Sequence, residues 1–341
     1  MNNPTALSTL RPSSPGTATI ARAAWHLEQI AAPQAWELSR GRGVVIAIID
    51  QAIDTRHPEF RDRVVSSYHV GTAAHRAPPR ARRLHGTQCA GVALAGGLTA
   101  TGVAPEASLM AIAVPSLGGC PDERAIARAI RWAAEEGADI ICCPFGPPAS
   151  AHPLTTAAEP PGAARRIGAA PGIKEAIDLA ATEGRGGRGC VVVFSAGNEG
   201  GPANPWASRA GVLAVGACNA RGGFCRYSNR GPGVWCALPS GDPDLAGEPD
   251  SLVLTTAPLG SFLEGDAIYS LTVGYTSLAA AAAAGLCAVI LSANPELRAD
   301  QVEAVLRGSL EEPVFPPRER FSWGRPNARR AVELALSLVA G

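Results

Sequence analysis

The sequence predicts an α/β protein with one mostly parallel central sheet and helices on both of its faces. Apolar, β-branched runs alternate with helical patterns at the spacing of β–α–β units. These runs are apolar throughout, which is typical of strands that are buried on both faces. The length of 341 residues suits one large α/β domain. We therefore expect a single domain over residues 22–341, preceded by a flexible tail, rich in Pro, Ser and Thr, over residues 1–21.

In the first half of the chain, Arg22–Leu38 has helical spacing that is interrupted at Pro33. The run Gly43–Asp50 (G-V-V-I-A-I-I-D) then predicts a buried strand that ends on a carboxylate. The sequence next predicts a helix, a strand, a second helix and a second strand, at Gly86–Leu94, Ser108–Val114, Asp122–Glu136 and Ala138–Phe145.

In the second half, a Pro- and Ala-rich segment over residues 146–172 is expected to be a surface insertion. The patterns that follow predict one helix, two strands and three C-terminal helices, at Ile173–Ala181, Cys190–Ala196, Val212–Ala217, Ser277–Ala293, Arg298–Arg307 and Ala328–Ala340. The first of the three C-terminal helices is nearly all alanine. Alanine favours helix and has a small side chain, so we expect this helix to lie deep in the protein.

Composition excludes several function classes. Lys+Arg and Asp+Glu number 30 each, so neither nucleic acid nor an anionic membrane surface is an expected partner. No apolar run reaches the length of a membrane span, because Leu278–Leu291 is too short, and we expect no membrane insertion. Residues 1–25 lack the pattern of a signal peptide, which favours a cytoplasmic protein. The nine cysteines form no C-x-x-C pair; we expect mostly reduced thiols, with one or two disulfides as the alternative.

Four polar residues stand where a parallel sheet gathers its functional groups. Asp50 ends a predicted strand, His85 opens a helix, Asn198 lies in the turn after a strand, and Ser277 begins the alanine-rich helix. Each has an ordinary interpretation when taken alone: a structural ion pair, a surface or core histidine, a turn asparagine and a helix cap. Taken together, they predict one site for nucleophilic catalysis.

The motifs around these residues are specific. They include H-G-T-Q-C-A-G from His85, a strand that runs into Gly197-Asn198, and I-D-Q-A-I-D-T-R-H-P from Ile49. Further stretches match between them, such as G-V-A-P-E-A, Y-S-N-R-G-P and W-G-R-P-N-A. From about Trp25 to Ala331 the chain resembles the subtilisin-like serine proteases (subtilases), and two of the motifs are similar to the kexin-like branch.

The resemblance implies a serine endopeptidase. Ser277 would attack the scissile carbonyl, His85 would take its proton, and Asp50 would hold the imidazole in the right tautomer. Asn198 would donate to the oxyanion. Substrate would bind as an added strand beside Cys143, Pro144, Phe145 and Gly146.

The resemblance also sets expectations for partners and cofactors. Peptides or proteins would be the substrates, and catalysis would require no cofactor. Structural calcium would be consistent with the family, but the sequence has no acidic loop of convincing ligand spacing, so no metal ligand is assigned. The short stretch over residues 1–25 favours a specialised processing protease, for example one that removes a leader peptide.

The sequence departs from the family pattern close to the site. Tyr275 takes the place of the usual glycine before the Thr-Ser pair, and it would be strained if the turn needs a positive φ. Pro144 and Pro147 remove two N–H donors from the expected substrate-binding strand. Four further departures are Gln51, Ala52, Ala281 and Ala282. The competing hypothesis is a pseudoprotease that binds peptides without cleaving them.

Overall fold

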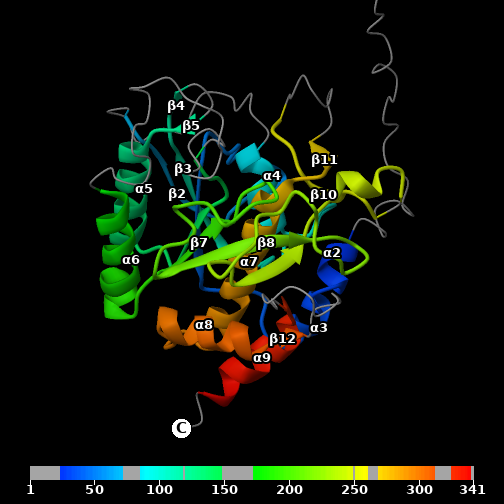
Figure 1. Ribbon diagram of the computed structural model, residues 1–341. Coiled ribbons are helices and arrows are strands. Elements are labelled where there is room, and N and C mark those ends of the chain that lie inside the picture. The colour runs from blue at the N-terminus through cyan, green and yellow to red at the C-terminus, as the bar shows by residue number, and fades with distance from the viewer. Residues whose placement is uncertain are drawn as a thin grey trace, which may run out of the picture.

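A seven-stranded parallel sheet forms the centre of the protein (Figure 1), which confirms the predicted fold class. The computed structural model describes residues 24–71, 85–117, 120–147, 172–248, 250–259, 268–311 and 324–338. The strand order is β2-β3-β1-β6-β7-β8-β9, and every neighbouring pair is parallel. The strands are β1 (Val45–Asp50), β2 (Val64–His69), β3 (Ser108–Ala113), β6 (Ile140–Cys143), β7 (Val191–Ser195), β8 (Val212–Cys218) and β9 (Cys236–Pro239).

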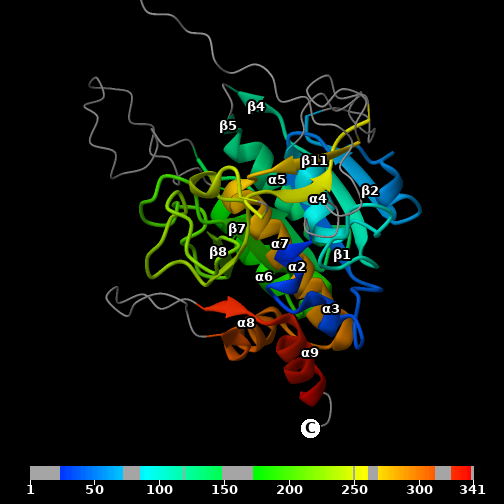
Figure 2. The ribbon, with the colours of Figure 1, turned by 90° about the vertical axis from the view of Figure 1, so that its right-hand side faces the viewer.

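Side chains of β1 alternate between two cores. Ile46 and Ile48 face one core, and Ala47 and Ile49 face the other. Helices α5 (Glu123–Glu135) and α6 (Ile173–Gly187) cover the second of these faces, whereas α4 (His85–Leu94) and α7 (Tyr275–Ala293) cover the first. Figure 2 shows α7 and α4 in front of the sheet, with α5 behind it. The outer surface of the first face is completed by α2 (Trp25–Glu28), α3 (Ala32–Ala35), α8 (Ala299–Gly308) and α9 (Ala328–Ser337).

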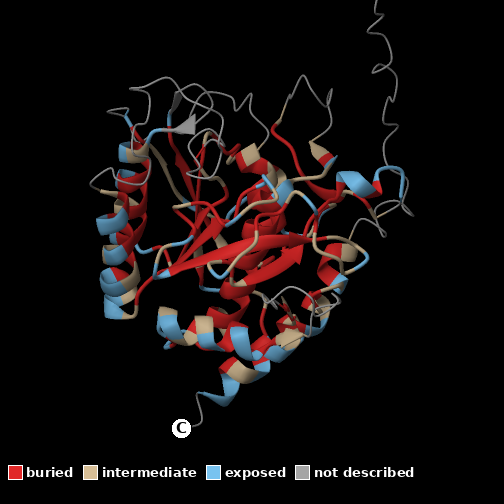
Figure 3. Cartoon of the chain, in the orientation of Figure 1, coloured by how far each residue is buried: buried red, intermediate tan, exposed pale blue. Residues whose placement is uncertain are grey.

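Helix α7 is buried along nearly all of its length (Figure 3). Every residue from Thr276 to Leu291 is buried. A Cβ at Gly285 would lie 2.7 Å from both the Ala93 carbonyl oxygen and the Val103 Cβ, so α4 and the following segment contact the backbone of α7 directly. The expectation that no apolar run is long enough to cross a membrane was wrong, because α7 has 19 residues and a sufficiently apolar composition. Its burial inside the fold identifies it as a core helix.

Other differences from the predicted elements have local causes. The first helical pattern forms two short helices, since Ala31 takes a left-handed conformation just before the proline of α3. Strand β6 ends at Cys143 because Pro144 follows it, two residues earlier than predicted. The partly exposed strand β2, the short edge strand β9 and three antiparallel pairs were not predicted: β4 (Ser116–Leu117) with β5 (Cys120–Pro121), β10 (Val253–Thr256) with β11 (Tyr269–Thr272), and β12 (Leu310–Glu311) with β13 (Arg325–Pro326).

Some predictions concern residues outside the described ranges. The tail over residues 1–21 and nearly all of the insertion over residues 146–172 lie there. Eight cysteines within the described ranges are free and buried, as expected for reduced thiols. The side chain of Cys120 is not described.

The loop after α4 is organised around a buried carboxylate, Glu59. The two oxygens of Glu59 accept the backbone N–H groups of four consecutive loop residues, and Oε1 also accepts the hydroxyl of Tyr269 in β11. The four residues are Gly97, Leu98, Thr99 and Ala100, with N–O distances of 2.8–3.0 Å. One negative charge therefore joins the β1–β2 connection, this loop and the β10–β11 hairpin.

We predict that Glu59→Gln lowers the free energy of unfolding by about 2–4 kcal/mol, because a neutral amide cannot accept all four N–H groups and its NH2 group would face two of them. The midpoint of thermal unfolding should fall by several degrees. The control is Glu296→Gln, which alters an exposed ion pair with Arg188 and should change the free energy by less than about 0.5 kcal/mol. Equal midpoints for the two variants would contradict the proposed role of Glu59.

Candidate active site

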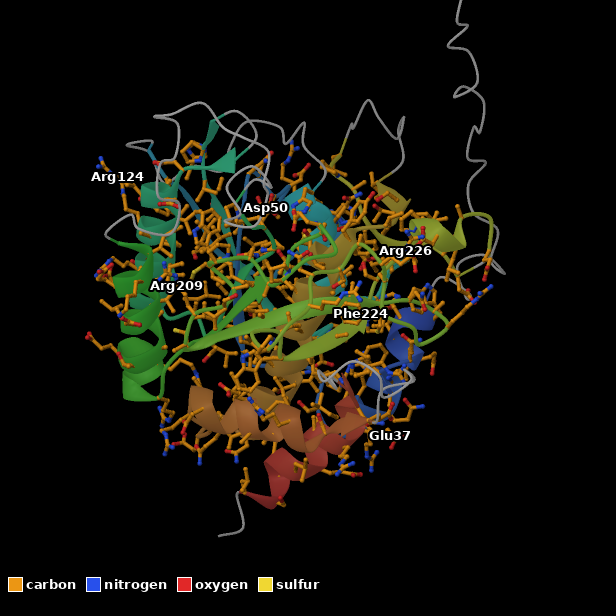
Figure 4. The ribbon with its side chains drawn as sticks, in the orientation of Figure 1. Glu37, Asp50, Arg124, Arg209, Phe224 and Arg226 are labelled. Carbon is orange, nitrogen blue, oxygen red and sulfur yellow. The ribbon has the colours of Figure 1, made fainter. Side chains whose placement is uncertain are left out.

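The carboxyl end of β1 brings an aspartate into contact with a histidine. Asp50 Oδ2 lies 2.7 Å from His85 Nδ1, and Asp50 Oδ1 accepts the backbone N–H of Gln51 at 2.6 Å. Figure 4 shows Asp50 beside α4, near the top of the sheet. The carboxylate is only 2% exposed and the imidazole is 43% exposed. A buried carboxylate thus contacts one nitrogen of a partly exposed imidazole ring.

This contact depends on a close approach of α4 to β1. A Cβ at Gly86 would lie 2.3 Å from the Ala52 carbonyl oxygen and 2.8 Å from the Asp50 Cβ, so only glycine fits directly after His85. Thr87 Oγ1 then accepts the backbone N–H of Asp54, which ties the helix start to the segment after β1. The small residues noted in the H-G-T motif therefore position the imidazole.

The Asp50 carboxylate changes the proton affinity of His85. Burial alone lowers the pKa of His85, but attraction to the Asp50 carboxylate and the hydrogen bond with it outweigh that effect and raise the pKa well above its ordinary value. Cys89 lies one helical turn further on, with its Sγ 4.0 Å from His85 Nδ1. Burial raises the pKa of the Cys89 thiol, so it stays protonated at neutral pH.

Ser277 is the third residue of α7, at the same edge of the sheet as Asp50. Ser277 is 7% exposed, and its Oγ donates a hydrogen bond of 2.6 Å to the Pro144 carbonyl oxygen. Among the described residues, Ser277 Oγ has no hydrogen bond with His85. At the third helical position its N–H is one of the first four of the helix, which have no acceptor within the helix.

Asn198 is held against the start of α7 by its amide oxygen. Asn198 Oδ1 accepts both the backbone N–H of Thr276, at 3.0 Å, and the Thr276 hydroxyl, at 2.6 Å. With Oδ1 occupied in this way, the NH2 group of Asn198 is left as a donor, and the described residues provide it with no acceptor. The exposed Asn198 amide is therefore bonded to Thr276, the residue directly before Ser277.

A second asparagine supports the turn that carries Asn198. Asn229 Oδ1 accepts the N–H groups of Glu199 and Gly201, and its NH2 group donates to Glu199 Oε2 at 2.7 Å. A Cβ at Gly197 would lie 2.3 Å from Asn229 Nδ2, so the turn needs glycine there. Sequence reasoning did not single out Thr276, Glu199 or Asn229. The Y-S-N-R-G-P stretch, which contains Asn229, was the available signal.

The last residue of β6 and the strip after it are the residues expected to bind substrate: Cys143, Pro144, Phe145 and Gly146. Cys143 is fully buried within the sheet, where it pairs with Phe194. The Phe145 ring packs edge-on against Phe194 and Trp206, at centroid distances of 6.2 and 6.3 Å. A Cβ at Gly146 would lie 2.8 Å from Asn204 Nδ2. The side chains of Cys143 and Phe145 therefore pack in the core. The Pro144 carbonyl is the polar group of this strip that contacts Ser277.

Tyr275 has the backbone conformation that its sequence position suggested. Its φ is 54°, directly after Gly274 with a φ of 66°, so the turn into α7 contains two left-handed residues. The conditional expectation of strain at Tyr275 is thereby confirmed.

The described residues contain one cluster of three side chains that could hold a metal ion: Asp50, His85 and Cys89. A thiol and an imidazole are poor ligands for calcium, which prefers oxygen. The Glu59 carboxylate is surrounded by N–H donors, so it does not face a cation either. Neither place fits a calcium ion.

Comparisons with known proteins identify the family of the chain. Residues 41–324 match the model of the Subtilase family. The "Calcium-dependent protease" of Nostoc sp. is 39% identical over 89% of this chain and 48% of its own length, and "Thermitase" of Thermoactinomyces vulgaris is 27% identical over 90% of this chain and 94% of its own. The chain spans about half the length of curated relatives such as this calcium-dependent protease.

Solved structures show the same fold. A structure titled "Crystal Structure of a Lanthipeptide Protease" matches with a TM-score of 0.74 at 22% identity, covering 94% of this chain and 96% of the other. A protease from Pseudoalteromonas arctica matches with a TM-score of 0.72 at 23% identity, covering 95% of this chain and all of the other. Because the family model covers most of the chain, from before β1 to beyond α8, this protein belongs to the Subtilase family.

Proposed function

We propose that the protein is a serine endopeptidase in which Ser277 is the nucleophile, His85 the general base and Asp50 the group that orients and stabilises the imidazole. The observation that carries this proposal is the 2.7 Å contact between the buried Asp50 carboxylate and His85 Nδ1. It leaves Nε2 of the imidazole as the nitrogen that can take a proton from Ser277. Asn198, held by Thr276, and the Ser277 N–H would donate to the oxyanion.

The hydrogen bond from Ser277 to Pro144 suggests how the site is engaged. An extended substrate that pairs with the strip after β6 would offer a backbone N–H to the Pro144 carbonyl. That N–H would compete with the Ser277 hydroxyl, which could then turn toward His85. Pro144 has no backbone N–H to donate, but its carbonyl oxygen is still able to accept a hydrogen bond from the substrate. Catalytic hydrogen bonds often tighten only when substrate is bound.

We further propose a processing role, such as removal of a leader peptide. The fold shared with a lanthipeptide protease and the kexin-like motifs support this role. Eight buried free thiols among the described residues favour a reducing compartment, and hence a cytoplasmic location. The calcium in the names of two relatives enters no step of this mechanism.

The competing hypothesis, a peptide-binding pseudoprotease, is favoured by two observations. Ser277 donates to Pro144 instead of His85, and Tyr275 strains the turn before it. Both hypotheses predict peptide binding, so a test must report on the reactivity of Ser277.

We predict that a fluorophosphonate probe labels the purified protein at Ser277. Labelling should be absent in Ser277→Ala and reduced at least about 10³-fold in His85→Ala, because the serine loses its base. Labelled wild-type protein should also cleave unstructured peptides. No labelling, together with binding of the same peptides, would establish the pseudoprotease instead.

The raised pKa of His85 sets the pH dependence. His85 must be neutral to act as a base, so the rate of labelling should rise with pH and reach half its plateau above about pH 6.5, the ordinary value for histidine. Asp50→Asn removes the charge that holds the proton and should move this midpoint to lower pH, while the plateau falls by about 10⁴. An unchanged midpoint would show that Asp50 does not control the imidazole.

We predict that Asn198→Ala lowers kcat by about 10²–10³ with little change in KM. Thr276→Val preserves the shape of a buried side chain but removes the hydroxyl that orients Asn198, and should lower kcat about tenfold. In the double variant, the Thr276 substitution should have no further effect, because its hydroxyl acts through Asn198. Additive losses would disprove this coupling.

A further inference from the structure

The backbone conformation of Tyr275 is one that favours glycine. With a φ of 54° it is a left-handed residue, and an aromatic side chain there is strained, whereas glycine would adopt the same conformation freely. Strained residues of this kind gather at functional sites, where the surrounding structure holds them in place. If the role of Tyr275 is structural, its side chain should be buried against neighbouring residues in a way that offsets this strain.

The packing around Tyr275 does not support a structural role. The side chain is 44% exposed, although the residues directly after it are buried. One ring, that of Tyr227, contacts it from the side, at a centroid distance of 4.9 Å and an angle of 73°. Part of Tyr275 is therefore exposed next to the turn before Ser277.

Both members of this aromatic pair are fixed. The Tyr275 carbonyl accepts the Ser240 hydroxyl at 2.7 Å. The Tyr227 hydroxyl donates to the Gly241 carbonyl at 2.8 Å, and its own carbonyl accepts the N–H of Gly200 at the same distance. These bonds fix the backbone of Tyr275 and the side chain of Tyr227, and the contact with Tyr227 limits the movement of the Tyr275 ring.

The pair lies between the two turns that build the candidate active site. Tyr275 is two residues before Ser277 and next to Thr276, which holds Asn198. Gly200, which bonds to Tyr227, is two residues after Asn198. A substrate carbonyl placed between Ser277 and Asn198 would bring its neighbouring side chains to the Tyr275 ring.

We propose that Tyr275, supported by Tyr227, is a specificity-determining residue whose ring packs against an apolar or aromatic side chain beside the scissile bond of the substrate. This inference rests on the proposed endopeptidase function. Aromatic rings bind such side chains through apolar area and edge-to-face contact.

The test compares cleavage profiles of the wild type, Tyr275→Gly and Tyr275→Phe on peptide libraries in which one position on either side of the scissile bond is varied. The wild type and Tyr275→Phe should prefer an apolar or aromatic side chain at one such position. In Tyr275→Gly, the ratio of kcat/KM for those peptides to kcat/KM for alanine peptides should fall at least about tenfold, and the variant should unfold at the same or a higher temperature because the strain is gone.

A matched control is Asp62→Gly, which replaces another exposed left-handed residue, with a φ of 66°, outside the site. It should leave the cleavage profile unchanged. The fluorophosphonate labelling rate is measured for every variant, so that reactivity of Ser277 is known independently of peptide preference.

Four outcomes would overturn the inference. An unchanged profile in Tyr275→Gly refutes it alone and leaves the endopeptidase function intact. A wild-type preference for Lys or Arg that Tyr275→Gly abolishes refutes the stated substrate chemistry. Loss of labelling in Tyr275→Gly but not in Tyr275→Phe shows that the ring builds the nucleophile turn instead. Absence of both labelling and cleavage in the wild type refutes the endopeptidase function and the inference together.

Discussion

The close packing of α7 against the sheet is the constraint on which the rest of the structure depends. The helix runs through the centre of the protein and contacts strands β6, β7, β8 and β9 together with α4 and α9. Only small side chains permit this, as the backbone-level contacts at Gly285 demonstrate. Because α4 and α7 pack on each other, the first residues of the two helices are held at fixed positions relative to one another. The imidazole and the serine hydroxyl are therefore positioned by core packing, and not by the loops around them.

The sequence was sufficient to predict the elements that form this arrangement. Uninterrupted apolar runs identified β1, β3, β6, β7 and β8, because a strand buried on both faces leaves a strong pattern. Strand β2 was missed since it is partly exposed and contains serines, which weakens that pattern. The hairpin of β10 and β11 was missed because its stability comes from α4 and Glu59, which are distant in the sequence.

The candidate site divides in the same way. The positions of Asp50, His85, Asn198 and Ser277 followed from motifs at strand and helix ends. Their supporting contacts did not, since the bonds from Thr276 to Asn198 and within the Asn229 turn depend on side-chain orientations that no spacing rule encodes. The hydrogen bond between Ser277 and the Pro144 carbonyl is of the same kind. Sequence reasoning found the candidate reacting groups, and the structure added the contacts that orient Asn198 and Ser277.

The buried thiols have a consequence for how the protein withstands stress. Burial raises the pKa of Cys190, Cys218 and Cys287 to about 12, so in the native state these sulfurs are neither ionised nor reachable by oxidants. Unfolding would expose the eight sulfurs that are buried in the described residues, and an oxidant would then be able to link them into disulfides that oppose refolding. Outside a reducing environment, the lifetime of the protein therefore depends on how rarely its core opens.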